Sequence, residues 1–404
     1  MSGSRAQRLA ARRAERRRAA RRHAMVAAAS VVVAVGAATG MMSAVGDGGG
    51  SDRARPGVTA SPRLEPLPAV PSPSPSATKS PSPEAGPGEE EKQKEKEKAS
   101  PEPSASRIEK KRRTTPVSTR LYRHPDSQVL NWLRANPDDP RRAVIESRIA
   151  DQPAAVWFAD HSPDSLTSRV RAVASGGAAQ GRTPVLVPYA IPDRDCGGHS
   201  QGGAPDLGAY DAWIDRFAAG LGTGEVIVIL EPDSIAQSAC LSAGQRADRF
   251  ASLARAGRVL KEANPRARVY FDAGHSGWHA PAKQAGWLRQ AGAASAASSD
   301  GIFSNVSNFH GTADEIAYDR AVLDALGGPS GLGAVIDTSR NGAGAPADGE
   351  WCDPAGRKVG RAPTLSTGEA GIDGYLWVKL PGESDGCKGT PGTFTPSYAY
   401  DLAR

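Results

Sequence analysis

Polar side chains follow one short apolar run after another in the second part of the chain, and the carboxyl groups among them include Asp160, Asp195, Glu231, Asp233, Asp272, Asp337, Glu383 and Asp385. Asp195 lies in "DRDC", Asp233 in "LEPDS" and Asp385 in "GESDG". Charged side chains are costly to bury unless they are paired, so this placement favours a functional edge over a core. The sequence shows no phosphate-binding loop, no cysteine nucleophile and no clear Ser-His-Asp order. The carboxyl groups after the apolar runs favour acid/base hydrolysis of glycosidic bonds. That reaction needs one protonated carboxyl group and one further carboxylate.

Tryptophans near the same apolar runs extend this interpretation. Trp157, Trp278, Trp351 and Trp377 lie close to the ends of the runs. Their flat rings would serve as platforms for pyranose sugars, although Trp377 stands inside a run and its ring would equally fill the core. Carboxylates together with tryptophans favour a polysaccharide substrate.

The segments that would position these residues alternate between strand and helix. Runs rich in β-branched and aromatic residues predict seven strands, at 155–159, 185–190, 226–230, 268–271, 301–305, 334–336 and 374–379. Alanine-rich stretches with helical spacing lie between most of them, including 206–220, 243–262, 281–291 and 313–326. This alternation predicts an α/β fold with a parallel sheet. We expect a single catalytic domain, a TIM-type (β/α) barrel of about seven parallel strands.

The basic and apolar segments at the N-terminus predict that the protein is exported. Residues 1–23 form a basic segment with nine arginines, and residues 24–45 carry no charge. This apolar segment suits a cleaved signal peptide and an uncleaved membrane anchor equally well. Residues 46–116 are rich in Pro, Ser, Glu and Lys and predict a disordered linker. We therefore expect a secreted or extracellular catalytic domain at 117–404, tethered to the membrane if the apolar segment is kept.

The charge balance differs between the two parts of the chain. Residues 1–120 hold 23 Lys and Arg against 12 Asp and Glu, whereas residues 121–404 hold 27 against 32. A nucleic-acid-binding domain normally carries its own basic patch, so the net negative charge of the second part argues against a nucleic-acid partner. A neutral substrate and a monomeric enzyme are the better expectation.

Four cysteines fall in the predicted catalytic domain. Export to an oxidising compartment favours two disulfides, and four cysteines allow three pairings. We favour Cys196 with Cys240 and Cys352 with Cys387, because both pairs close loops of moderate size. No Cys/His spacing typical of zinc is present, so we expect neither a metal nor another cofactor.

Six motifs resemble, in this order, those of the family six glycoside hydrolases. They are "YAIPDRDCGGHSQGG", "VILEPDSIA", "DAGHSGWH", "SNVSNF", "WCDP" and "LWVKLPGESDGC". The similarity covers nearly all of the chain from residue 120 to the end. It implies a cellulase with a distorted barrel of about seven strands, and it agrees with the two disulfides favoured above.

The resemblance implies roles for the three aspartates. Asp233 matches the family's catalytic acid, which protonates the leaving glycosidic oxygen. Asp195 matches the aspartate that raises the pKa of that acid and helps to stabilise the oxocarbenium-like transition state. Asp385 matches the position proposed as the general base of an inverting mechanism.

The resemblance also implies a set of substrate-binding residues. Tyr189 would lie near the distorted sugar, and Ser200 on a mobile loop that holds the water chain. The others would stack on sugars, hydrogen bond their hydroxyls or support the cleft wall: Trp157, Trp278, Trp351, Lys379, Glu383, Asn308 and Asp272.

Some neighbouring residues fit a structural role as well. Arg194 is expected to form an ion pair that holds the "DRDC" loop. Asp160 suits a structural contact and a substrate contact equally. His275 and His310 would act as hydrogen-bonding residues behind the substrate, not as metal ligands.

Short loops favour an endo-acting enzyme. Only ten residues separate Arg340 from Trp351, too few to roof a cleft into a tunnel. We therefore expect an endo-β-1,4-glucanase with an open groove. The alternatives are a processive cellobiohydrolase, a non-catalytic envelope-tethered glycan-binding protein and a metal-dependent barrel hydrolase.

Overall fold

The computed structural model describes residues 120–404 except 163 and 199. The basic segment 1–23, the apolar segment 24–45 and the linker 46–116 lie outside the described residues, as do the first three residues of the predicted catalytic domain. In the part of the chain that is described, no helix has the length and apolar character needed to cross a membrane.

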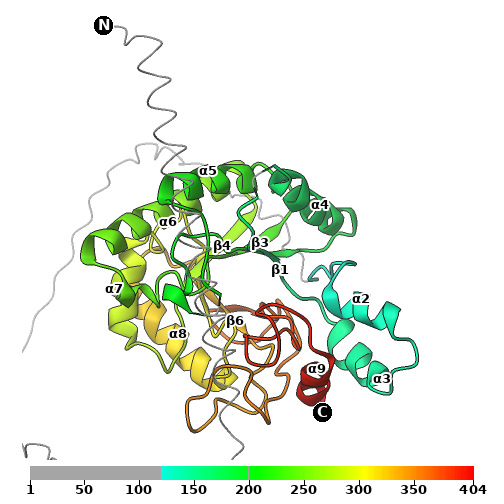
Figure 1. The fold of residues 1–404 in the computed structure, drawn as a ribbon. Helices are drawn as coiled ribbons and strands as arrows, with labels where there is room; N and C mark the ends of the chain where they lie inside the picture. The colour runs from blue at the N-terminus through cyan, green and yellow to red at the C-terminus, as the bar shows by residue number, and fades with distance from the viewer. Residues whose placement is uncertain (1–119, 163, 199) are drawn as a thin grey trace, which may run out of the picture. The chain divides into compact units, whose positions relative to one another are not determined.

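A seven-stranded parallel sheet forms the centre of the fold (Figure 1). Its strands are β1 Val156–Phe158, β2 Val185–Pro188, β3 Val226–Leu230, β4 Ala267–Asp272, β5 Gly301–Ser304, β6 Gly333–Asp337 and β7 Ile372–Leu376. They pair in chain order. The outermost strands β1 and β7 approach through one backbone hydrogen bond, from Ala155 N to Trp377 O (2.9 Å), so the sheet curls into an incompletely closed barrel. The predicted barrel of seven parallel strands is confirmed.

Helices surround the sheet and cover its outer face (Figure 1). The α-helices are α2 Gln128–Ala135, α3 Arg142–Ile145, α4 Leu166–Ala179, α5 Leu207–Ala218, α6 Ala243–Ala263, α7 Pro281–Gln290, α8 Thr312–Leu326 and α9 Pro396–Ala403. A π-helical turn at Glu146–Ala150 continues α3, and short 3₁₀ turns occupy Asp195–Gly197 and Ser238–Cys240. Helices α5 to α8 match the four helical stretches that the sequence predicts.

Local sequence signals explain where these helices begin. Ser242 and Gln245 form a reciprocal capping box at the start of α6, because Gln245 N donates to Ser242 Oγ (3.3 Å) and Ser242 N donates to Gln245 Oε1 (3.1 Å). Asp206 caps α5 by accepting from Ala209 N (2.8 Å). Pro281 occupies the first turn of α7, where its missing N–H costs nothing.

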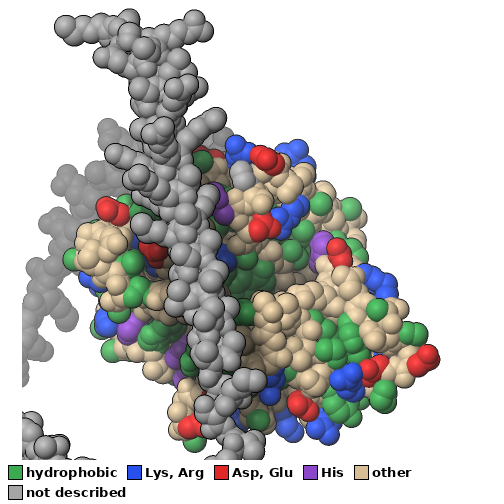
Figure 2. Space-filling view, viewed as in Figure 1, with side chains coloured by type: hydrophobic (Ala, Val, Ile, Leu, Met, Phe, Trp, Pro, Cys, Tyr) green, Lys and Arg blue, Asp and Glu red, His purple; other side chains and the backbone are tan. Residues whose placement is uncertain are grey.

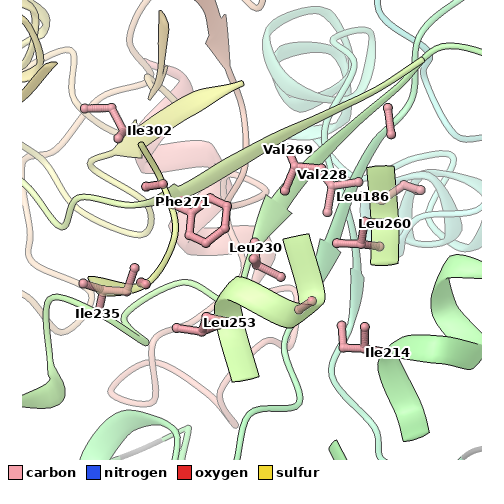
Figure 3. Packing of buried hydrophobic residues seen from close by; sticks show 14 of the residues in the cluster. Leu186, Ile214, Val228, Leu230, Ile235, Leu253, Leu260, Val269, Phe271 and Ile302 are labelled. Carbon is pink, nitrogen blue, oxygen red and sulfur yellow. The ribbon is translucent and has the colours of Figure 1, made fainter. Parts of the chain in front are cut away.

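Alternate residues of the strands build two apolar layers. Leu186 of β2 and Val228 of β3 belong to the outer layer between the sheet and the helices, which includes Leu260 of α6. Figure 3 shows these three side chains close together on the helix-covered side of the strands. Val187 and Ile229 belong to a second cluster, inside the barrel. Because both faces are buried, the strands read as continuous apolar runs, and their carboxyl ends are the first positions where polar side chains are tolerated.

Candidate active site

A cavity of about 1230 Å³ lies against the loops that follow the strands. Its lining includes eleven of the twelve candidate catalytic and substrate-binding residues: Trp157, Tyr189, Asp195, Ser200, Asp233, Trp278, Asn308, Trp351, Lys379, Glu383 and Asp385. Residues up to 228 positions apart in the chain, from Trp157 to Asp385, therefore meet at one site. The location agrees with the usual place of active sites in parallel barrels.

Strained backbone conformations concentrate in the same loops. Eight described residues other than glycine have positive φ angles: Asp193, Asp195, Cys196, Glu231, Asp233, Asn305, Ser307 and Asp353. All of them lie in loops that follow β2, β3, β5 and β6. Such conformations persist only when the surrounding contacts enforce them, and they cluster at functional sites. The loops thus present their polar side chains in a fixed arrangement.

Asp195 is anchored within its loop. Its Oδ2 accepts hydrogen bonds from Ser200 N (2.7 Å) and Ser200 Oγ (2.9 Å), and its Oδ1 accepts from Gln237 Nε2 (3.2 Å). The Ser200 hydroxyl also lies 3.2 Å from Tyr189 Oη. The disulfide between Cys196 and Cys240 ties this loop to the one after β3, which confirms the predicted pairing.

Arg194 holds the loop in a different way from the predicted one. Its guanidinium donates to three carbonyl oxygens, those of Ser200 (2.9 Å), Ala159 (2.8 Å) and Tyr189, and it lies 4.5 Å from the centre of the Tyr189 ring. Among the described residues no ion pair involves it, so the expected ion pair is wrong. Five N–H donors in a planar fork suit several carbonyls at once. The loop is thereby joined to the ends of β1 and β2.

Glu231 connects the ends of β2 and β3 from beneath the site. The side chain is fully buried, and its carboxylate accepts from Ala190 N (3.0 and 2.9 Å) and Ile191 N (3.0 Å). Burial raises the pKa of Glu231 to about 7, although these amides oppose the shift. These contacts hold Ala190 and Ile191, the first part of the loop that carries Asp195, in place.

Asp233 is the carboxyl best suited to hold a proton. Burial raises its pKa well above the ordinary value, and the charges of Asp272, Asp195 and Asp385 raise it further, in that order. A carboxyl in such surroundings keeps its proton at pH values where an exposed aspartate is ionised. Asp233 can therefore donate a proton into the cavity that it lines.

Asp272 lies beneath the cavity and not at its wall. It is 1% exposed and is absent from the cavity lining. Its Oδ2 accepts from Ile235 N (2.9 Å) and Ala236 N (2.8 Å), and its Oδ1 accepts from Gly274 N (2.9 Å). Because Asp272 is buried and outside the cavity lining, the expectation of a substrate-binding residue at the cleft wall is wrong. Asp272 instead supports the turn that follows Asp233 and raises the pKa of that residue.

Asp385 forms a buried ion-pair cluster with two cations. Its Oδ2 lies 2.6 Å from Arg340 Nη1, and its Oδ1 lies 3.4 Å from Lys379 Nζ. Lys379 Nζ also donates to Ser384 O (3.2 Å), and Arg340 Nη1 contacts Tyr398 Oη (3.3 Å). The two cations position the carboxylate of Asp385 at the edge of the cavity.

Asp353 organises the loop that carries Asp385, a role that no pattern in the sequence predicts. Its carboxylate accepts from Ser384 Oγ (2.5 Å) and from the amides of Asp385 (2.8 Å), Cys387 (3.0 Å) and Lys388 (2.8 Å). These bonds lower its pKa despite its burial. The disulfide Cys352–Cys387, which the sequence analysis also predicted, braces the loop beside it. The only sequence signal was an acid directly after a half-cystine in "WCDP".

The aromatic residues of the site differ in exposure. Trp351 is 50% exposed at the rim. Trp157 is half-buried, lies edge-on to Tyr189 at 5.2 Å and donates from its indole nitrogen to Val378 O (2.8 Å). Trp377 is 3% exposed and packs in an apolar cluster with α2, α3 and α9, so its ring mainly fills the core.

Two histidines, His275 and His310, line the cavity together with Trp278. His275 lies 5.1 Å from the Trp278 ring and stacks on His310 at 4.2 Å. Burial is the main cause that lowers the pKa of His275 to about 3, so it is neutral at ordinary pH. In 120–162, 164–198 and 200–404, no three His, Cys, Asp or Glu residues are grouped as metal ligands.

Other candidates take structural contacts as well. Glu383 Oε1 accepts from Gln128 Nε2 (2.9 Å), and burial raises the pKa of Glu383 to about 7. Asn308 donates its backbone amide to Asn305 O (3.0 Å). Asp160, for which two roles were open, forms an ion pair with Arg169 (2.6 Å) at the surface.

Figure 2 shows acidic and basic side chains interspersed over the described part of the face that it presents. No large area of one sign gathers there, which agrees with a neutral substrate.

Comparisons with known proteins give the family. The family model of the Glycosyl hydrolases family 6 matches residues 113–400. "Endoglucanase 1" of Streptomyces sp. (strain KSM-9) is 53% identical over 72% of this chain and 79% of its own length. "Endoglucanase A" of Thermobispora bispora is 49% identical over 70% of this chain, and the match spans 61% of that longer relative.

A solved structure agrees with these relatives. The endoglucanase Cel6 from Mycobacterium tuberculosis, in complex with methyl-cellobiosyl-4-deoxy-4-thio-β-D-cellobioside, superposes with a TM-score of 0.65 at 38% identity. The match covers 70% of this chain and 96% of that one. The chain therefore belongs to family 6 of the glycosyl hydrolases and is a glycoside hydrolase.

Proposed function

We propose that this protein is an endo-β-1,4-glucanase that hydrolyses internal bonds of cellulose or a related β-glucan, with inversion at the anomeric carbon. One observation carries the proposal. A single cavity holds Asp233, whose raised pKa suits a general acid, together with Asp385, which is paired with two cations. The names of the endoglucanase relatives support the substrate class.

Each carboxylate has a part in the proposed reaction. Asp233 donates its proton to the glycosidic oxygen as the bond to the leaving sugar breaks. Asp195 raises the pKa of Asp233 and stabilises the positive charge that develops on the sugar. Asp385 acts as the base that takes a proton from the attacking water on the opposite face. We assign to Ser200, whose hydroxyl contacts Asp195 and Tyr189, the role of hydrogen bonding this water.

The sugar units would lie along the aromatic residues of the cavity. Trp157, Trp278 and Trp351 offer ring faces or edges to successive pyranose units. Lys379 and Glu383 line the same cavity and supply polar groups for sugar hydroxyls, and Asn308 adds an amide. These roles follow from position and chemistry together with the family resemblance.

The endo mode rests on the exposure of the rim. Trp351 is 50% exposed, and the segment between Arg340 and Trp351 is only ten residues long. A polymer chain can enter such a groove from the side, whereas an enclosed tunnel admits chain ends.

Viscometry on carboxymethylcellulose tests the activity and the mode together. We expect the wild-type chain to lower the viscosity steeply while few reducing ends appear. Release of cellobiose alone, with little loss of viscosity, would contradict the endo mode. No reducing ends at all would contradict the hydrolysis.

We also propose the organisation of the N-terminal part from the sequence alone. Residues 1–23 and 24–45 act as an export signal or membrane anchor, residues 46–116 are a linker, and residues 117–404 form the catalytic domain as a monomer. Mass spectrometry of the exported chain would locate its true N-terminus.

A further inference from the structure

Glu315, in the first part of α8, reaches a loop of the candidate active site. Its Oε1 accepts a hydrogen bond from Ser276 N (2.9 Å). Ser276 lies between His275 and Trp278, which both line the cavity. The loop is further closed by a bond from Trp278 N to His275 O (2.9 Å). The position of Trp278 therefore depends on an acceptor that a buried carboxyl group supplies.

A second buried carboxyl group lies one helical turn further along α8. Asp319 Oδ2 accepts from Ser304 Oγ (3.0 Å), at the end of β5. Glu315 and Asp319 are both 0% exposed. Within the described residues, neither carboxyl forms an ion pair with a cation, and the second oxygens, Glu315 Oε2 and Asp319 Oδ1, have no hydrogen-bond partner. Two buried unpartnered acceptors one turn apart form an unstable arrangement if both groups are ionised.

Among the described residues the pair has no ion-pair partner for a second negative charge, and only hydrogen bonds from Ser276 and Ser304 oppose the effect of burial on its pKa values. Beyond the effect of burial, the charge of Asp314 raises the pKa of Glu315, and the pair in turn raises the pKa of Tyr318, on which Asp272 of β4 also acts. The Tyr318 hydroxyl is already committed, since it donates to Ala273 O (2.9 Å). Burial raises the pKa of Glu315 and of Asp319, and Glu315 raises that of Asp319 further.

We propose that Glu315 and Asp319 share a single proton and that, in this state, Glu315 is a positioning residue for the glucan-binding loop of His275 and Trp278. Asp319 keeps the proton on Oδ1 and donates it to Glu315 Oε2, which gives both unpartnered oxygens a partner. Glu315 carries the negative charge, because its Oε1 accepts from Ser276 and it lies nearer the helix N-terminus. The role in glucan binding rests on the function proposed above, whereas the shared proton does not.

The proposal predicts a specific dependence of stability on pH. In the unfolded chain both carboxyls have ordinary pKa values near 4, but the native state keeps one extra proton. The native state therefore loses stability as the pH rises above the unfolded pKa values, until the native pair releases its proton. The Asp319→Asn variant has no such proton, and its amide can donate permanently to Glu315 Oε2 while its oxygen accepts from Ser304.

Thermal unfolding of the full chain between pH 5 and 8 tests the shared proton. We expect the melting temperature of Asp319→Asn to exceed that of the wild type by an amount that grows with pH. Glu315→Gln is a second variant with the same expected trend, because its amide accepts from Ser276 and donates to Asp319. Asp324→Asn removes an exposed carboxylate from the same helix and should follow the wild type. Parallel curves for the wild type and both pair variants would overturn the shared proton.

Kinetics on cellohexaose test the positioning role. Glu315→Ala removes the acceptor of Ser276, so KM should rise about tenfold while kcat changes much less, and Glu315→Gln should restore KM to within a few-fold of the wild type. A Glu315→Ala variant with unchanged KM would overturn the positioning role. The unfolding measurement needs no substrate, so a wild type without glucanase activity would refute the proposed function and leave the shared proton to its own test.

Discussion

Arg340 and Asp385 form a buried ion pair that joins the loop after β6 to the loop after β7. The Nη1–Oδ2 distance is 2.6 Å, with 0% of the guanidinium side chain and 6% of the carboxylate side chain exposed. Asp385 is the candidate base, so the same contact that positions the base also neutralises a cation in the protein interior. Catalysis and stability therefore depend on one interaction.

The Asp385→Ala variant should lose stability as well as activity. It leaves Arg340 buried without its partner, and breaking a buried pair in this way typically costs about 3–5 kcal/mol. Urea unfolding of the variant and the wild type measures the difference in the free energy of unfolding.

Glu369→Ala provides the matched control. It removes the exposed ion pair of Glu369 with Arg320 (2.9 Å), which should change stability by less than about 1 kcal/mol. Equal losses in the free energy of unfolding in the two variants would show that the buried ion pair stabilises the protein no more than the exposed one.

The Asp195→Asn variant should move the alkaline limb of the pH profile to lower pH. Asp233 must be protonated to act, and the charge of Asp195 helps to raise its pKa. Removing that charge lowers the pKa of Asp233, so the acid loses its proton at a lower pH. Profiles of kcat/KM against pH report this group in the free enzyme. Asp193→Asn, at an exposed position of the same loop, is the control, and an alkaline limb that stays in place in Asp195→Asn would contradict the coupling.

The products should form with inversion. Attack of water opposite the leaving group converts a β-1,4 bond into a new reducing end in the α configuration. Proton NMR of cellohexaose, recorded in the first minutes before mutarotation, distinguishes the two anomers. Initial release of the β anomer would point to a covalent intermediate and remove Asp385 from the role of base.

Much of the fold is predictable from the sequence because it depends on local pattern. Strands β2, β3 and β6 are buried along their whole length and appear as short apolar runs, whereas β7 contains Asp373 and Gly374 and begins two residues before the run predicted at 374–379. Helices α5 to α8 appear as alanine-rich stretches between the strands. Helix α4, Leu166–Ala179, is harder to predict, because Ser175, Gly176 and Gly177 interrupt its apolar pattern with weak helix formers. The short helices α2, α3 and α9 depend on packing around Trp377, which no local pattern reveals.

For the candidate site, the sequence predicts which polar residues lie near the strand ends and which motifs they belong to. It does not predict which of them line the cavity or which contacts they make. Asp233 follows β3 and Asp272 is the last residue of β4, yet Asp233 lines the cavity whereas Asp272 accepts from three amides beneath it. That difference depends on the path of the loops in space. The partnership of Arg340 with Asp385 spans 45 residues and needs the curled sheet to bring the two loops together. Asp353 and Gln237 carry no distinctive sequence signal for their contacts.

The central claim is that Asp233 is the general acid of a glucan hydrolase. The most direct test compares Asp233→Asn with the wild type on two substrates, cellohexaose and 2,4-dinitrophenyl cellobioside. Hydrolysis of cellohexaose should fall by about 10²–10⁴-fold, because its sugar leaving group needs the proton. The dinitrophenolate leaves without protonation, so hydrolysis of that substrate should fall far less. Wild-type rates of Asp233→Asn on cellohexaose, or equal losses on both substrates, would contradict the assignment.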